Sequence, residues 1–316
     1  MNTTDQKNTA GVEKKAVTFK SNGLAIAGML YLPTDFNAFG QLRPAIVVGH
    51  PGAGVKEQAA GLYAGLLAEK GYVALAFDAA YQGESEGLPR NYEDPAQRVE
   101  DIKAAVTFLT SMEEIDAERI GVLGICASGG YGVSAAATDH RIKVLATVSA
   151  AGIGHQFRKG GDGLQAPEVI QNLLDFAALD RRKTASGEQP GEFPIFPASS
   201  EDARALGDHV YEGWEYYCTD RGYHPRSAKT FTWKSVELAA GFDAFRFAGM
   251  IAPRPLLMIA GTEAKTLWMT REAMENAQEP KNLVMIDGAT HVDLYDKMEF
   301  VAPAVTKIVE FYTANL

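Results

Sequence analysis

Cysteine is scarce in this sequence of 316 residues, which contains only Cys126 and Cys218. No Cys/His pair has the spacing of zinc ligands, so no metal site is predicted. The first eight residues are polar and lack the apolar segment that a secretory signal peptide needs. Together with the low cysteine count, this favours a reducing compartment. We therefore expect a cytoplasmic protein.

Long apolar runs and basic clusters are also missing. No run approaches the roughly 18 apolar residues of a membrane span, and the net charge of −10 argues against nucleic acid or anionic membrane as partner. The nearest approach to a phosphate loop, residues 49–54, is followed by Val55 where lysine is required. We therefore predict a small-molecule substrate and no cofactor, and leave open whether the protein is a homo-oligomer.

The sequence does contain a regular alternation of strand and helix patterns. Apolar runs of strand length, such as 44–49, alternate with helical segments, which is typical of a mostly parallel sheet with helices on both faces. Two leading strands joined by the hairpin turn 21–23 make the sheet mixed. The predicted strands are 16–20, 24–32, 44–49, 72–77, 119–124, 142–149, 255–260 and 282–286, and the predicted helices are 57–70, 95–110, 128–138, 268–278 and one from about 302.

Residues 151–250 interrupt this alternation. They are rich in glycine at the start and in aromatic residues at 211–217. Because an unstructured insertion of this length is unusual in a compact domain, we predict that the segment forms a cap with helices of its own. The predicted organisation is a flexible N-terminus at 1–14, an α/β core at 15–150 and 251–316, and a cap at 151–250.

The strongest motif is the stretch from Gly124 to Gly130, between a predicted strand and a helix of small residues. This is the context of a nucleophile elbow, a strained turn that exposes a reactive side chain. The nucleophile is either Cys126 or Ser128. We favour Cys126 because it directly follows the strand, and because the helix N-terminus should make its thiol more acidic. The alternative is that Cys126 is a buried structural cysteine.

A base and an acid should follow the nucleophile in the chain. His291 comes just after the last predicted strand, where a loop can place its imidazole over the edge of the sheet. Glu263 is the only carboxylate in the turn 261–266, so it is the positional candidate for the acid that orients the histidine. Asp293 is the rival, and Asp243 is a more distant one.

An oxyanion hole should use the backbone N–H of Ala127, the residue after the nucleophile. Its second donor should come from the turn after the strand 44–49. Pro51 has no N–H, so Gly52 or Ala53 must donate, and we assign the hole to Gly52 and Ala127.

The substrate pocket should be built by a loop of the core and by the cap. Residues 77–87 follow a core strand and should lie at the rim of the site, with Tyr81 contacting substrate and Asp78 bracing the loop. The aromatic residues Trp214 and Tyr217 of the cap should line an apolar pocket for the acyl group.

These motifs resemble the α/β-hydrolase superfamily. Its dienelactone-hydrolase-like branch, which includes bacterial hydrolases related to X-prolyl dipeptidyl peptidases, is the most similar. Enzymes of that branch carry a cysteine in a Gly-x-Cys-x-Gly-Gly elbow, and Gly124, Cys126, Gly129 and Gly130 match it with one extra residue, Ser128. The likeness extends over the predicted core.

The resemblance implies an α/β-hydrolase fold with a helical cap inserted late in the chain. It implies hydrolysis of a carboxylic ester, thioester or lactone through an acyl-enzyme on Cys126. An acyltransferase and a non-catalytic binding protein of the same fold are the alternatives. The family often places aspartate where this sequence has Ala264 and Lys265, so both Glu263 and Asp293 stay candidates for the acid.

Overall fold

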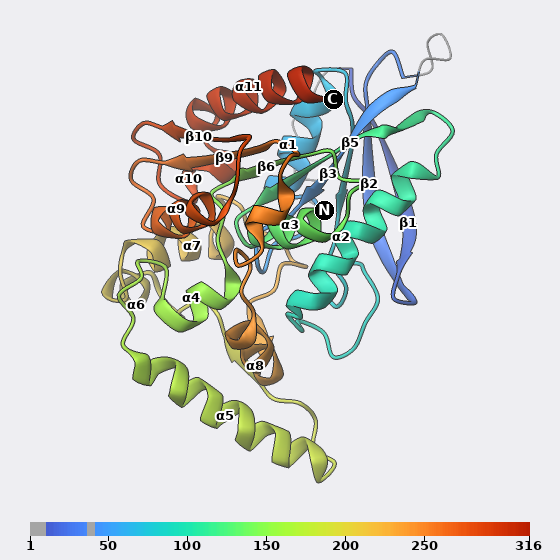
Figure 1. Ribbon diagram of the computed structural model, residues 1–316. Helices are drawn as coiled ribbons and strands as arrows, with labels where there is room; N and C mark the ends of the chain where they lie inside the picture. The colour runs from blue at the N-terminus through green and yellow to red at the C-terminus, as the bar shows by residue number, and fades with distance from the viewer. Residues whose placement is uncertain (1–10, 37–41) are drawn as a thin grey trace.

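An eight-stranded sheet runs through the computed structural model, which describes residues 11–36 and 42–316 (Figure 1). The strand order is β1-β2-β4-β3-β5-β6-β9-β10. β2 pairs antiparallel with β1 and β4, and the other neighbours are parallel, so the predicted mixed, mostly parallel sheet is confirmed. The strands are β1 (Glu13–Ser21), β2 (Leu24–Leu32), β3 (Arg43–Gly49), β4 (Val73–Phe77), β5 (Ile115–Ile125), β6 (Val144–Val148), β9 (Leu256–Gly261) and β10 (Lys281–Ile286).

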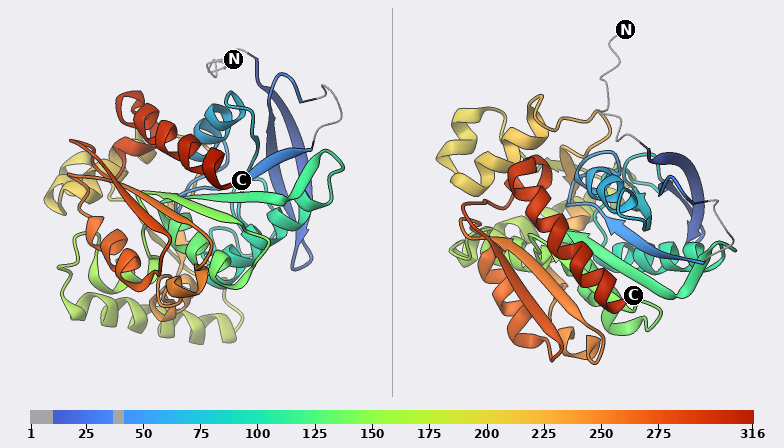
Figure 2. Two further views of the ribbon diagram at one scale, coloured as in Figure 1. Left: turned by 45° about the horizontal axis from the view of Figure 1, so that its top comes forward. Right: turned by 90° about the horizontal axis from the view of Figure 1, so that it is seen from above.

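Helices cover both faces of this sheet (Figure 2). One face carries α1 and α11, and the other carries α2, α3 and α9. The helices of the core are α1 (Ala59–Ala68), α2 (Pro95–Thr110), α3 (Ala127–Thr138), α9 (Leu267–Asn276), α10 (Asp293–Asp296) and α11 (Met298–Asn315). The last helix begins at Met298, four residues before the predicted start, and contains Pro303 in its interior.

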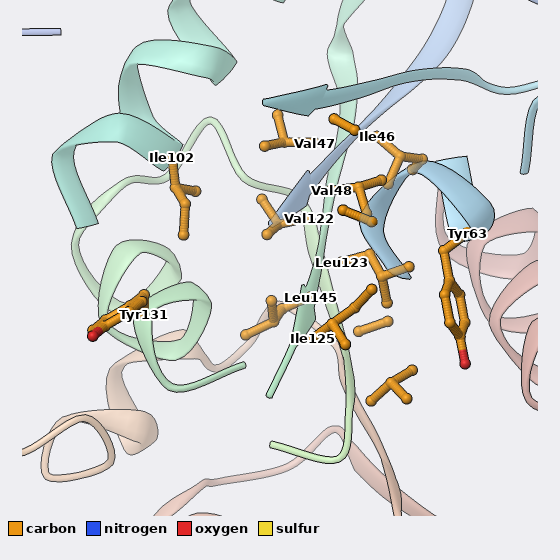
Figure 3. Packing of buried hydrophobic residues seen from close by; sticks show 14 of the residues in the cluster. Ile46, Val47, Val48, Tyr63, Ile102, Val122, Leu123, Ile125, Tyr131 and Leu145 are labelled. Atoms are coloured by element: carbon orange, nitrogen blue, oxygen red, sulfur yellow. The ribbon is translucent and has the colours of Figure 1, made fainter. Parts of the chain in front are cut away.

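The central strands are buried on both faces, as the apolar runs in the sequence predict. Successive side chains of a strand point to opposite faces, so Val122 lies on the side of Tyr131 in α3 and Leu123 on the side of Tyr63 in α1 (Figure 3). All four side chains are fully buried. Burial on both faces explains why these strands show no alternation of polar and apolar residues.

Residues 151–250 fold into helices and one small antiparallel sheet of two short strands. Their elements are α4 (Ile153–Lys159), α5 (Pro167–Ala185), β7 (Glu192–Pro194), α6 (Ser200–Ala205), α7 (Asp208–Cys218), β8 (Thr230–Thr232), α8 (Trp233–Gly241) and the 3₁₀ helix η1 (Ala248–Ile251). We call residues 151–250 the cap. It contacts the turn after β3, where Ala228 N–H donates to Ala53 O over 2.9 Å.

The first strand begins earlier in the chain than the sequence predicts. Residues 1–10 of the predicted flexible segment 1–14 lie outside the described residues, and β1 already begins at Glu13. Within residues 11–36 and 42–316, no helix combines the length and the apolar character needed to cross a bilayer.

A buried ion pair fastens the loop after β4 to the turn after β3. Asp78 accepts hydrogen bonds from the backbone N–H and the Nζ of Lys56, both over 2.8 Å, and from the backbone N–H of Glu84 over 2.9 Å. The side chains of Asp78 and Lys56 are 0% and 3% exposed. Asp78 therefore braces these loops, as expected from the sequence.

Replacing Asp78 should destabilise the fold strongly. Asp78→Ala leaves the buried Lys56 ammonium and two backbone N–H groups without this acceptor, and breaking a buried pair typically costs about 3–5 kcal/mol. Urea unfolding checks this, with Glu118→Ala as control, because the ion pair of Glu118 with Lys143 lies at the surface. Such a surface pair contributes about 0–1 kcal/mol. Equal losses in the two variants would contradict the structural role of Asp78.

Candidate active site

The elbow places Cys126 in a strained backbone conformation. Cys126 stands between β5 and α3 with φ 54° and ψ −119°, a region that non-glycine residues rarely occupy and that occurs at active sites. The turn is possible because the flanking residues Gly124 and Gly129 have no side chain. A Cβ on Gly124 would lie 2.2 Å from Ser128 O, and one on Gly129 would lie 2.7 Å from the Cβ of Ala150.

The alternative nucleophile, Ser128, has a different environment. Its hydroxyl donates to His50 O over 2.6 Å, and its side chain is buried beneath the turn. Cys126 lines the large cavity between core and cap, and Ser128 does not. This geometry favours Cys126 over Ser128, because only the thiol faces a space that substrate can enter.

Three polar groups favour the thiolate of Cys126. The backbone N–H groups of Gly52 and Ala127 and the hydroxyl of Tyr295 each act to lower the pKa of the thiol. Burial nevertheless raises the pKa of the Cys126 thiol, because desolvation of the thiolate outweighs these donors. The expectation from the sequence, a thiol made more acidic by the helix N-terminus, is therefore wrong for the free enzyme.

His291 lies in the loop between β10 and α10, held at both ring nitrogens. Its Nδ1 is 2.5 Å from the hydroxyl of Thr266, and its Nε2 is 3.0 Å from the hydroxyl of Tyr295. Burial, with a smaller contribution from His209, lowers the pKa of His291 to about 3, so the imidazole is neutral at physiological pH. The hydroxyl of Tyr295 thus connects the imidazole to the thiol of Cys126.

The structure does not bring any of the three predicted acids to the ring of His291. Glu263 is exposed and lines a separate polar pocket at the surface. Asp293 pairs with Lys297 over 2.7 Å, and Asp243 accepts hydrogen bonds from two backbone N–H groups of its own loop. The sequence predicts a carboxylate as the partner of the His291 ring. The partner of Nδ1 is instead the hydroxyl of Thr266, from the same turn as Glu263.

A second histidine, supplied by the cap, lies beside His291. His209 and His291 have ring centroids 5.0 Å apart in an edge-to-face arrangement. The Nδ1 of His209 is 2.8 Å from a carboxylate oxygen of Glu212. Sequence position argues against His209 as the base, because it does not follow a late strand of the core, and no sequence motif indicates Glu212.

The thiol of Cys126 opens into a cavity of about 550 Å³ between core and cap. Gly52 and Ala127 line the cavity, and most of its other lining residues are aliphatic or aromatic. Among the described residues that line it, none is Lys, Arg, Asp or Glu. Cap residues that form its apolar walls include Ile153, Phe157, Leu173, Phe193, Phe196 and Phe231.

Of the three residues predicted to contact substrate, Tyr217 lines this cavity, and its hydroxyl donates to Gly52 O over 3.2 Å. Tyr81 instead packs edge-to-face on Tyr92, and Trp214 stacks on Tyr211. Neither Tyr81 nor Trp214 lines the cavity. Their ring positions depend on side-chain packing within a loop and a cap helix, which a one-dimensional pattern does not encode.

Metal ligands would have to come from clusters of His, Cys, Asp or Glu side chains. Among residues 11–36 and 42–316, no group of three or more such residues is arranged to hold a metal ion.

Comparison with known proteins identifies similar chains. The model of the dienelactone hydrolase family matches residues 26–167. The Escherichia coli (strain K12) protein YcjY is 37% identical over 93% of this chain and 95% of its own. The crystal structure of protein PA2218 from Pseudomonas aeruginosa, 36% identical, superposes with a TM-score of 0.89 over 98% of this chain and 95% of that one. The thiohydrolase aneE of Aspergillus aculeatus is 32% identical over 62% of this chain and 58% of its own.

The raised pKa of Cys126 predicts slow alkylation at neutral pH. In a Cys218→Ser variant, Cys126 is the sole cysteine, and its rate of reaction with iodoacetamide reports its thiolate fraction. The rate should rise about tenfold per pH unit up to and beyond roughly pH 8.5, the ordinary pKa of a thiol. Mass spectrometry of the alkylated chain measures the rate. A plateau already reached at pH 7 would show that the thiol is acidic.

Proposed function

The chain belongs to the dienelactone hydrolase family of α/β-hydrolases, and we propose that it cleaves carboxylic esters, thioesters or lactones through a covalent acyl-enzyme on Cys126. Its family membership confirms the resemblance predicted from the sequence. The observation that carries the proposal is the position of the Cys126 sulfur, which faces the cavity beside two amide donors and is linked through Tyr295 to His291.

Acylation begins from a neutral thiol and a neutral imidazole. As the sulfur of Cys126 attacks the carbonyl carbon, its proton passes to the hydroxyl of Tyr295, whose own proton passes to the Nε2 of His291. The carbonyl oxygen gains negative charge and moves into the hydrogen bonds of Gly52 and Ala127. When the bond to the leaving group breaks, the proton on His291 passes through the hydroxyl of Tyr295 to the leaving oxygen or sulfur.

The cavity favours an uncharged, apolar acyl group. A carboxylate bound there would lose its hydration without meeting a cation, because no Lys or Arg lines the described walls. Burying an unpaired charge is strongly unfavourable. We therefore infer that the substrate is the ester or thioester of a neutral aliphatic or aromatic acid, and that an anionic dienelactone binds poorly.

The same acyl-enzyme would serve an acyltransferase that passes the acyl group to an alcohol or amine. The apolar cap wall over Cys126 favours this second candidate, because it limits the water near the thioester. Products formed with and without an added alcohol distinguish hydrolysis from transfer. A non-catalytic binding protein would form no acyl-enzyme.

The acidic net charge of −10 supports a small-molecule substrate with no nucleic acid or membrane partner. A cytoplasmic location is part of the same proposal.

Replacing the two candidate nucleophiles should separate their roles. With p-nitrophenyl octanoate as substrate, Cys126→Ala should abolish the reaction, because it removes the attacking sulfur. Ser128→Ala should retain it within about tenfold, since it loses only the buried hydrogen bond to His50 O and a long one from Arg98, each worth about 1 kcal/mol. Release of p-nitrophenolate measures both. Full activity of Cys126→Ala together with an inactive Ser128→Ala would assign the nucleophile to Ser128.

The partner of Nδ1 can be tested in the same assay. Thr266→Val removes the hydroxyl from His291 but keeps the side-chain shape, and loss of one orienting hydrogen bond should lower kcat/KM about tenfold. Glu263→Gln is the control and should change kcat/KM less than twofold, because Glu263 is exposed. The reverse pattern would support Glu263 as the acid predicted from the sequence.

A further inference from the structure

The carboxylate–histidine pair of this cavity comes from the cap and not from the core. His209 and Glu212 are three residues apart in the first turns of α7, a spacing that places their side chains side by side. The Nδ1 of His209 is 2.8 Å from one oxygen of Glu212, and the other oxygen accepts the backbone N–H of Val292 over 3.2 Å. Glu212 is therefore fixed between the cap histidine and the loop that carries His291.

This arrangement fixes the tautomer of His209. An ionised carboxylate only accepts hydrogen bonds, so the neutral ring must carry its proton on Nδ1 and keep a lone pair on Nε2. Among the described residues, the hydrogen-bond partner of that lone pair is the side-chain nitrogen of Gln156, at a long distance of 3.5 Å. His209 and Gln156 both line the cavity that contains Cys126. Nε2 is thus a base with a weakly held lone pair in the substrate cavity.

The two neighbouring histidines differ in their partners. Both ring nitrogens of His291 are occupied by hydroxyl groups, and one of these hydroxyls leads to the thiol of Cys126. His209 has a carboxylate behind it, and a carboxylate is the partner that stabilises a protonated imidazole. His209 is therefore the better placed of the two to receive a proton from a molecule in the cavity.

We propose that His209 and Glu212 act as a second general base that activates the acyl acceptor, either water or an alcohol, in the deacylation step. This proposal rests on the proposed acyl-enzyme at Cys126 and assigns its second half-reaction to the cap. Nε2 of His209 removes the acceptor's proton while the acceptor oxygen bonds to the acyl carbon. The carbon–sulfur bond breaks and leaves the thiolate of Cys126. The proton on His209 then returns to that thiolate, so each cycle consumes no net proton.

The decay of a preformed acyl-enzyme tests this proposal directly. The full chain is mixed in excess with p-nitrophenyl octanoate, release of p-nitrophenolate gives the acylation rate, and intact mass follows loss of the octanoyl group. In His209→Gln we expect acylation within about threefold of wild type and decay slower by about 10²-fold or more, the usual contribution of a general base. The octanoyl group should then accumulate on Cys126.

Variants of Glu212 and of a control carboxylate test whether His209 and Glu212 act together. Glu212→Gln should slow decay about tenfold, and the double variant should be no slower than His209→Gln alone, because the two residues act as a unit. Asp208→Asn, a change of an exposed carboxylate on the same helix, should leave the decay unchanged within about twofold. His209→Ala should regain decay when imidazole is added, an effect that a purely structural role of the side chain would not produce.

Three outcomes would overturn the proposal. They are decay of His209→Gln at the wild-type rate, equal slowing of acylation and decay, and failure of imidazole to restore decay in a His209→Ala chain whose thermal unfolding matches wild type. Failure of the underlying function is distinguishable from all three. In that case, wild type gains no octanoyl group on Cys126, and the variants of His209 have nothing to slow.

Discussion

The left-handed backbone of Cys126 is the constraint on which the site depends. β5 can turn directly into α3 only because Gly124 and Gly129 let the strand, the helix and the loop after β6 approach closely; a Cβ at Gly124 would lie 2.2 Å from a backbone oxygen. That turn aims the sulfur into the cavity and brings the N–H groups of Gly52 and Ala127 to it. The proposed nucleophile and the Ala127 part of the proposed oxyanion hole therefore arise from one local conformation, and losing it would remove both.

Burial determines the protonation states of the Cys126 thiol and the His291 imidazole. The pKa of the Cys126 thiol is raised and that of His291 is lowered, in both cases chiefly by desolvation. A thiolate–imidazolium pair is therefore not the resting state. Proton movement has to accompany attack on the carbonyl, when the developing oxyanion supplies charge that the amide donors stabilise. In the proposed mechanism the proton passes through the hydroxyl of Tyr295, which lies 3.0 Å from Nε2 of His291 and lowers the pKa of the Cys126 thiol.

The sequence predicts the fold better than it predicts the site. Apolar runs such as 44–49 identify buried strands, and the run of small residues around Cys126 identifies the elbow, because both are local patterns. Glu263 failed as a contact of His291 because its position in a turn does not determine its side-chain direction, which is outward, whereas Thr266 points inward. His209 was missed for a different reason. Only the folded cap brings it next to His291, 82 residues later in the chain.

In the proposed mechanism the cap takes part in catalysis and is more than a cover for the cavity. Arg221 of the cap binds both carboxylate oxygens of Asp296, over 2.8 and 3.0 Å, and so holds α10, the short helix that carries Tyr295. Tyr217 donates to Gly52 O beside the oxyanion hole, and Glu212 accepts the N–H of Val292 next to His291. Each of these contacts joins the cap to a residue in or beside the proton path or the oxyanion hole. Movement of the cap would therefore change the chemistry of the core as well as its exposure to water.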